Sequence, residues 1–127
     1  MAQALTKPAA RDGLRLLVVE DEVMISTLIE DMLAELGHRM VGLASTVEEA
    51  AGLAAAGDFD VALLDVNLQG QSVEAVAAAL ARRGKPFVFT TGYGDRAIPP
   101  AFKDRPMLAK PYHVDQLGAM LARVAGE

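Results

Sequence analysis

The sequence predicts an α/β domain in which a parallel sheet is covered by helices on both faces. Short, largely apolar segments of strand length alternate with longer segments in which apolar residues recur at helical spacing. Because several of the short segments are apolar without alternation, their strands are expected to be buried on both faces. Five strands alternating with five helices are typical of a doubly wound parallel sheet with right-handed crossovers.

Each element is placed by its own pattern. Strands are predicted at residues 14–19, 39–43, 61–64, 87–89 and 107–109. Helices are predicted around residues 25–36, 45–57, 73–84 and 117–124. Ser45 and Glu48 predict a capping box at the start of the second helix. Asp95 predicts the cap of a further short helix, which Pro99 and Pro100 limit in length.

Length, composition and charge restrict the class of protein. The 127 residues are predicted to form a flexible tail, residues 1–12, and one domain, residues 13–127, with no output domain attached. The net charge of −5, without a basic cluster, argues against nucleic-acid binding. The lack of cysteine excludes disulfides and thiolate metal sites. Because neither a signal peptide nor an apolar run of roughly 20 residues is present, we expect a cytoplasmic protein without a membrane partner.

Polar residues follow the predicted strands at their carboxyl ends, where open α/β sheets bind ligands. Glu20 and Asp21 come after the first strand, and Asp65 comes directly after the third. Thr91 follows the fourth strand and Lys110 the fifth. Each residue alone is a weak signal, but together they predict a site at one edge of the sheet.

The chemistry of this residue set can be stated from its charges. Three adjacent carboxylates repel one another unless one is protonated or a cation joins them. Carboxylate oxygens suit a hard cation that keeps several waters, which favours Mg²⁺, or Mn²⁺ in its place. A carboxylate can act as a nucleophile toward phosphorus, and a metal, a lysine and a hydroxyl would stabilise the transferring group.

The motifs VVEDE, LLDVN, FTTGY and AKP, in this order and spacing, resemble the signature of response-regulator receiver domains. The resemblance covers residues 13–127 and implies a flavodoxin-like fold with strand order 2-1-3-4-5. It implies that Asp65 is the phosphoacceptor, with metal ligands from Glu20, Asp21, Asp65 and the backbone carbonyl of Asn67.

The same resemblance assigns roles around Asp65. It implies that Thr91, followed by the small Gly92, is the switch hydroxyl, and that Lys110 pairs with the phosphoryl group. It also implies a cis peptide between Lys110 and Pro111. The expected phosphodonor is a histidine kinase or a histidine phosphotransfer protein. The expected signalling face comprises the fourth helix, the fifth strand and the fifth helix, including Met107 and Tyr112, and is read by a partner or a homodimer.

The chain also departs from the usual receiver pattern. Met107 stands where receivers usually have an aromatic residue that rotates inward on activation. A Met-Pro motif often follows the phosphoacceptor, whereas this chain has Leu68-Gln69-Gly70. The stretch PFVFTTGYG is similar to the FATGUY subgroup of stand-alone receivers, which is tied to stress-response phosphorelays in alphaproteobacteria. Tyr93 is expected at the rim of the site, where it would shield an acyl phosphate from water.

The residues predict a phosphorylated switch and not an enzyme that acts on a separate substrate. They also bear on three other functions. A phosphatase of the haloacid-dehalogenase type needs a second Asp at the position of Asn67. A flavodoxin needs a phosphate-binding loop where this chain has Glu20 and Asp21. A receiver-like interaction module that signals without phosphorylation stays open because of Met107.

Overall fold

The computed structural model describes residues 13–92, 94 and 97–126 and contains the predicted parallel sheet. The strands of this sheet are β1 (Arg15–Val19), β2 (Arg39–Ala44), β3 (Val61–Asp65), β6 (Phe87–Thr91) and β7 (Met107–Ala109). They lie in the order β2-β1-β3-β6-β7, and every neighbouring pair is parallel. Counted along the chain within this sheet, the order is 2-1-3-4-5, which confirms the predicted fold class.

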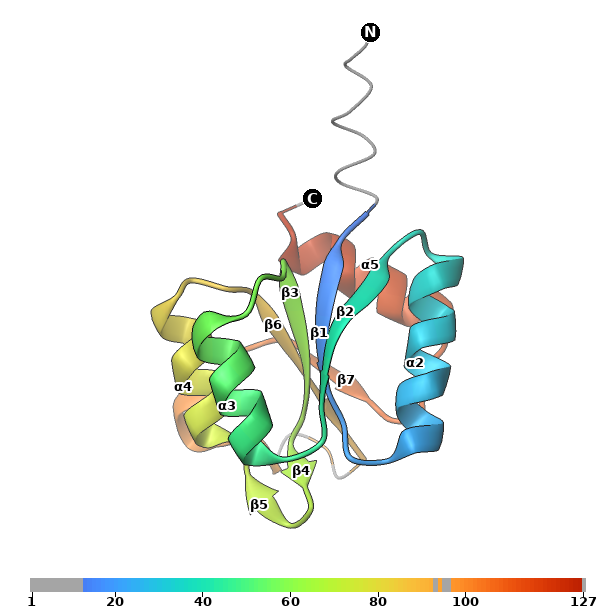
Figure 1. Ribbon diagram of the computed structural model, residues 1–127. Helices are drawn as coiled ribbons and strands as arrows, with labels where there is room; N and C mark the ends of the chain where they lie inside the picture. The colour runs from blue at the N-terminus through green and yellow to red at the C-terminus, as the bar shows by residue number, and fades with distance from the viewer. Residues whose placement is uncertain (1–12, 93, 95–96, 127) are drawn as a thin grey trace, which may run out of the picture.

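Helices cover both faces of the sheet (Figure 1). They are α2 (Val23–Glu35), α3 (Val47–Ala56), α4 (Glu74–Arg82) and α5 (Val114–Val124). α2 and α5 bury one face, which includes Leu16 and Val18 of β1, while α3 and α4 bury the other, which includes Leu17 and Val19. Within the described residues, no helix is long and apolar enough to cross a membrane.

The start of α3 lies one residue later than the predicted capping box. The Thr46 side chain is the N-cap and accepts a hydrogen bond from the backbone N–H of Glu49 at 3.1 Å. The Glu49 carboxylate in turn accepts from the backbone N–H of Ser45 at 3.0 Å. The prediction of Ser45 and Glu48 was therefore wrong by one position, because Ser45 and Thr46 each precede a Glu by three residues.

The connection between β6 and β7, where the fourth helix was predicted, contains no α-helix in its described residues. Its described part holds the short 3₁₀ turn η2 (Pro100–Phe102), while the expected cap of the predicted helix, Asp95, lies outside the described residues. Pro99 and Pro100 have no N–H to donate and so do not extend a helix into this segment. The Phe102 ring still anchors the segment, with its centroid 6.1 Å from that of Phe87.

A small antiparallel hairpin follows β3 and lies beyond the carboxyl ends of β1 and β3 (Figure 1). Its strands are β4 (Asn67–Leu68) and β5 (Gln71–Ser72). The two turn residues between them, Gln69 and Gly70, have φ angles of 53° and 74°. Two positive φ angles are the requirement of a type I′ turn. This turn adds a structural element at the edge of the sheet where the site was predicted.

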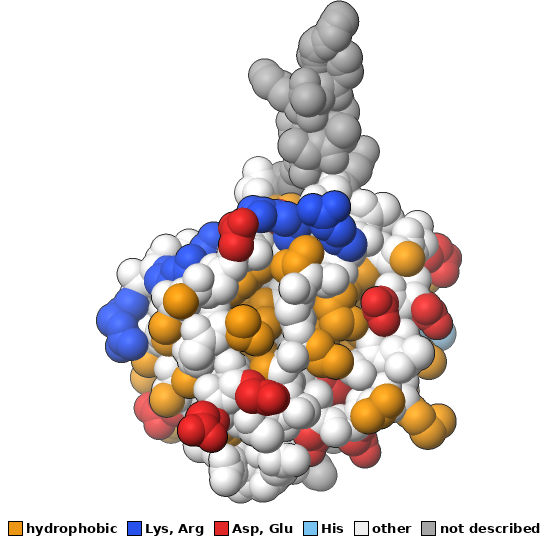
Figure 2. Space-filling view, viewed as in Figure 1, with side chains coloured by type: hydrophobic (Ala, Val, Ile, Leu, Met, Phe, Trp, Pro, Cys, Tyr) orange, Lys and Arg blue, Asp and Glu red, His pale blue; other side chains and the backbone are white. Residues whose placement is uncertain are grey.

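Lys and Arg side chains gather at the opposite end of the molecule, where the strands begin (Figure 2). Arg15, at the start of β1, forms an ion pair with Asp60 at 3.0 Å. The cations of Arg83 and Lys85 lie 5.5 Å and 5.3 Å from the ring centroid of Phe59. Asp60 is therefore a structural partner of Arg15, far from the predicted site.

Candidate functional site

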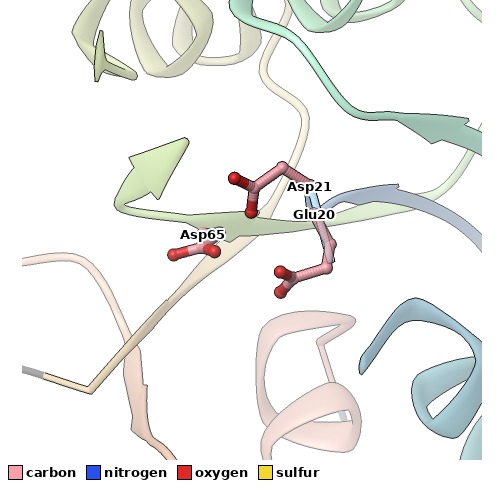
Figure 3. Close-up of side chains that lie close together, drawn as sticks. All are labelled: Glu20, Asp21 and Asp65. Carbon is pink, nitrogen blue, oxygen red and sulfur yellow. The ribbon is translucent and has the colours of Figure 1, made fainter. Parts of the chain in front are cut away.

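The ends of β1 and β3 bring together the three carboxylates predicted to form the site. Asp65 is the last residue of β3, and Glu20 and Asp21 directly follow β1. The two strands are neighbours in the sheet, with Val19 paired to Leu64. One oxygen of each carboxylate lies within 4.8 Å of the others, and the three groups face one another (Figure 3).

Asp65 is held from two sides in a buried position with 6% of its surface exposed. The backbone N–H of Asn67 donates to Oδ1 of Asp65 at 3.1 Å. The ammonium of Lys110 donates to Oδ2 of Asp65 at 3.2 Å. These contacts fix the direction of the carboxylate, and the burial limits its contact with bulk water.

Lys110 enters the site from the end of β7. Its backbone N–H donates to the carbonyl of Thr91 at 2.8 Å, which continues the pairing of β6 with β7. Its ammonium lies 3.2 Å from both Glu20 and Asp65, and the peptide bond to Pro111 is cis as expected. Burial alone would lower the pKa of Lys110, but the charges of Asp65 and Glu20 raise it above its ordinary value. A charged ammonium is therefore fixed beside Asp65.

Glu20 is more deeply buried than Asp65, with 3% of its surface exposed. Its Oε2 accepts a hydrogen bond from the backbone N–H of Glu22 at 3.2 Å, and its Oε1 faces Lys110. Burial, followed by the negative charge of Asp65, raises the pKa of Glu20, and Lys110 offsets this only in part. Burial and the charge of Asp65 both disfavour a negative charge on Glu20, and a divalent cation would offset both effects.

The raised pKa of Glu20 predicts a pH dependence of folding in the presence of a chelator. Because the pKa of Glu20 is raised in the folded protein, its contribution to stability is full below its unfolded pKa, about 4.5, and is lost as pH rises through the folded value. The free energy of unfolding from urea titrations should therefore fall more between pH 4.5 and neutrality in the wild type than in Glu20→Gln. Parallel pH profiles of the two proteins would contradict the assigned cause.

The residues present fit a hard divalent cation. Asp21 is only partly buried and, with Asp65 and Asn67, lines an open pocket of about 390 Å³ that can admit water ligands. Asn67, whose backbone carbonyl was predicted to bind metal, lies two residues beyond Asp65 in β4. The carboxylates Glu20, Asp21 and Asp65 could hold Mg²⁺ or Mn²⁺ from one side, with the remaining ligands from water and Asn67.

The predicted switch residues occupy different positions around the pocket. Thr91 is the buried last residue of β6, and Gly92 lines the pocket beside it. Tyr93, predicted to shield the site, lies outside the described residues. Met107 pairs with Phe89 and packs, half-buried, into the core on the α3–α4 face of the sheet.

Tyr112 and Met107, which are both expected on the signalling face, pack against different sides of the sheet. Tyr112 packs against the core formed by α2 and α5. Its hydroxyl is buried and has no hydrogen-bond partner among the described residues. Burial and then the charges of Glu20 and Asp65 raise the pKa of Tyr112 to about 12. The role of Tyr112 in signalling stays a prediction.

An apolar groove of about 480 Å³, which was not predicted from the sequence, lies next to the acidic pocket. The lining residues come from α2 and from the segment after β7: Met24, Ile25, Leu28, Ile29, Met32, Lys110, Pro111 and Tyr112. Ile25 and Lys110 line both the groove and the acidic pocket. Met24 is 84% exposed and Leu28 58% exposed, which indicates that α2 is apolar on more than its core-facing side. The signal for this groove in the sequence is the number of apolar residues in α2, which exceeds what one core-facing side needs.

A comparison with known protein families decides what this arrangement is. The model of the response regulator receiver domain matches residues 16–122. The chain belongs to the response regulator receiver family. In this receiver the acidic cluster and Lys110 lie together at the carboxyl ends of β1, β3 and β7.

Solved structures of similar proteins support the receiver assignment. SdrG from Sphingomonas melonis Fr1 is 42% identical, with a TM-score of 0.75, covering 90% of this chain and 96% of SdrG. The receiver domain of the sensor histidine kinase PA1611 from Pseudomonas aeruginosa PAO1 is 28% identical, with a TM-score of 0.77. That match covers 91% of this chain and 99% of the other, which holds a magnesium ion in its active-site cleft.

Curated relatives are longer than this receiver. The phyllosphere-induced regulator PhyR of Methylorubrum extorquens is 29% identical over 123 residues, which cover 91% of this chain and 45% of PhyR. The transcriptional regulatory protein PdtaR of Mycobacterium tuberculosis is 29% identical over 107 residues, 81% of this chain and 52% of PdtaR. The chain thus spans about half the length of these relatives.

Proposed function

We propose that this receiver accepts a phosphoryl group on Asp65, in a reaction that depends on Mg²⁺ or Mn²⁺. One observation carries the proposal: the buried carboxylate of Asp65 lies between the ammonium of Lys110 and two further carboxylates that fit a divalent cation. The magnesium ion in the active-site cleft of the PA1611 receiver supports the choice of metal. The protein would act as a switch on its own Asp65 and not as an enzyme on a separate substrate.

The geometry suggests what each residue does in the transfer. An oxygen of Asp65 attacks phosphorus, and the O–P bond forms as the bond from phosphorus to the donor's nitrogen or oxygen breaks. A cation held by Glu20, Asp21 and Asp65 would neutralise charge on the phosphoryl oxygens. Lys110 is already within 3.2 Å of Asp65 and can offer its ammonium to one of those oxygens. Thr91 would bond another, which makes it the switch residue, with Gly92 beside it.

The proposed donor is a histidine kinase or a histidine phosphotransfer protein. A protein that delivers a phosphoryl group to Asp65 has to cover the rim of the acidic pocket. The apolar groove is continuous with this pocket through Ile25 and Lys110. We therefore place the donor over α2, with apolar side chains in the groove, whereas a small donor such as acetyl phosphate has no need of it. A cytoplasmic location stays a prediction.

A receiver-like interaction module that signals without phosphorylation is the second candidate. Met107 favours it, because β7 carries a flexible thioether where an aromatic ring would otherwise relay the signal. Signalling through the surface of η2, β7 and α5, to a partner or a second copy of the chain, is compatible with both candidates. The two differ in whether Asp65 becomes covalently modified.

Incubation with acetyl phosphate tests the proposal directly. In Mg²⁺, intact mass spectrometry should detect the gain of one phosphoryl group, because the metal and Lys110 offset the charge of the incoming phosphate. The same incubation in EDTA should give background labelling. No gain of mass in Mg²⁺ would overturn the proposed function and leave the interaction module.

A further inference from the structure

We propose that the turn between β4 and β5 sets the affinity of the site for its cation, and that the backbone of Gln69 controls this turn. The inference rests on the proposed function, since the cation is the one that would assist Asp65. Gln69 would be a positioning residue that acts through Asp21, and not itself a metal ligand.

The first observation is a set of hydrogen bonds from this short segment to the site. The backbone N–H of Gln69 donates to Oδ2 of Asp21 at 3.1 Å, and that of Gly70 donates to Oδ1 of Asn67 at 3.1 Å. The N–H of Asn67 donates to Asp65, also at 3.1 Å. Three N–H groups of one segment therefore orient three residues that the receiver signature assigns to the site.

The Gln69 contact matters most because of which carboxylate it holds. Asp21 is only partly buried, whereas Glu20 and Asp65 are buried and both contact Lys110. Asp21 is therefore the carboxylate with the greatest freedom to turn away. The bond from Gln69 joins the hairpin after β3 to the acid after β1, across 48 positions of sequence. Hydrogen bonds of this kind hold a metal ligand in its binding orientation.

The second observation is the backbone conformation that delivers this N–H. Gln69 has a φ of 53°, a value that suits Gly or Asn and disfavours other residues, above all β-branched ones. Among the described residues, Gln69 is the one non-glycine residue with a positive φ. The Met-Pro motif that receivers often carry after the phosphoacceptor would offer no N–H from its proline. The contact with Asp21 is thus a feature of this chain's own turn.

The test compares two substitutions that both remove the Gln69 side chain and change the backbone preference in opposite directions. Gln69→Val disfavours the turn and should weaken Mg²⁺ binding about tenfold, the loss typical when a hydrogen bond to a metal ligand is removed. Gln69→Gly favours the turn and should bind Mg²⁺ at least as tightly as the wild type. Affinity is measured by isothermal titration of each metal-free protein with MgCl₂, and urea unfolding verifies that each variant is folded.

Gln71 provides the matched control, because it is the same residue type in β5 of the same hairpin and its φ is not positive. Gln71→Val should leave the Mg²⁺ affinity unchanged. The inference would be overturned if Gln69→Val and Gln69→Gly bound Mg²⁺ with equal affinity, or if Gln71→Val lost as much affinity as Gln69→Val. The proposed function would still stand in that case, provided that the wild type showed Mg²⁺-dependent labelling. A wild type that neither binds Mg²⁺ nor becomes labelled would overturn both.

Discussion

Replacement of Asp65 by Asn is expected to reduce phosphoryl incorporation from acetyl phosphate to background while the domain stays folded. The amide is nearly the same size as the carboxylate, so the packing at the end of β3 is preserved, but it is a far weaker nucleophile. It also withdraws one of the three carboxylates that fit the cation. Intact mass spectrometry after incubation with acetyl phosphate and Mg²⁺ measures the effect.

The matched control is Asp104→Asn, which makes the same chemical change at an exposed position outside the acidic cluster. It should be labelled to the same extent as the wild type. Labelling of Asp65→Asn at the wild-type level would place the acceptor on another residue and remove the basis of the proposed function.

Replacement of Lys110 by Ala is expected to affect both stability and phosphorylation. Glu20 and Asp65 would lose the ammonium that contacts both of them, and their buried charges would face each other. The Lys110 side chain is 20% exposed, so we expect a loss of about 1–3 kcal/mol in the free energy of unfolding, between the values for exposed and fully buried pairs. The rate of labelling by acetyl phosphate should fall roughly 100-fold, as when one fixed donor to a transition state is removed.

Urea unfolding with and without Mg²⁺ separates the two effects of Lys110→Ala. A divalent cation supplies positive charge to the same carboxylates, so Mg²⁺ should stabilise the variant more than the wild type. Labelling should stay slow in saturating Mg²⁺, since the cation does not replace the ammonium. Lys103→Ala, at an exposed position, should change neither quantity. An unchanged unfolding free energy in Lys110→Ala would contradict the role assigned to the ion pairs.

Much of the fold and site could be predicted because each depends on local patterns. Apolar segments of strand length predicted β1, β3 and β6, and the residues that follow them predicted the convergence of Glu20, Asp21 and Asp65. The position of Lys110 before a proline predicted its place at the end of β7. These predictions succeeded because a parallel sheet brings the carboxyl ends of its strands to one edge, whatever the details of packing.

The features that were missed depend on interactions between distant segments. The contact between Gln69 and Asp21 joins two loops, and no local pattern in Leu68-Gln69-Gly70 indicated a positive φ at Gln69. The packing of Tyr112 against the core formed by α2 and α5 likewise joins distant segments. The fourth helix was expected from the alternation of elements and from Asp95, and the described residues of that connection hold only the 3₁₀ turn η2. Contacts between distant segments decided the first two of these cases.

The short edge strand β7 makes local opening of the sheet less costly at one edge than at its centre. With three residues it is the shortest strand of the sheet, it has one strand neighbour, and the described residues before it form no α-helix. Local opening is least costly where few ordered hydrogen bonds and little buried surface are lost, so amide protons of this edge should exchange faster than those of the central β3. Thr91 and Lys110 are joined by a backbone hydrogen bond at this edge, whereas Glu20 follows and Asp65 ends the inner strands β1 and β3. We therefore expect a structural change that begins among these four residues to move β7 more than β1 or β3.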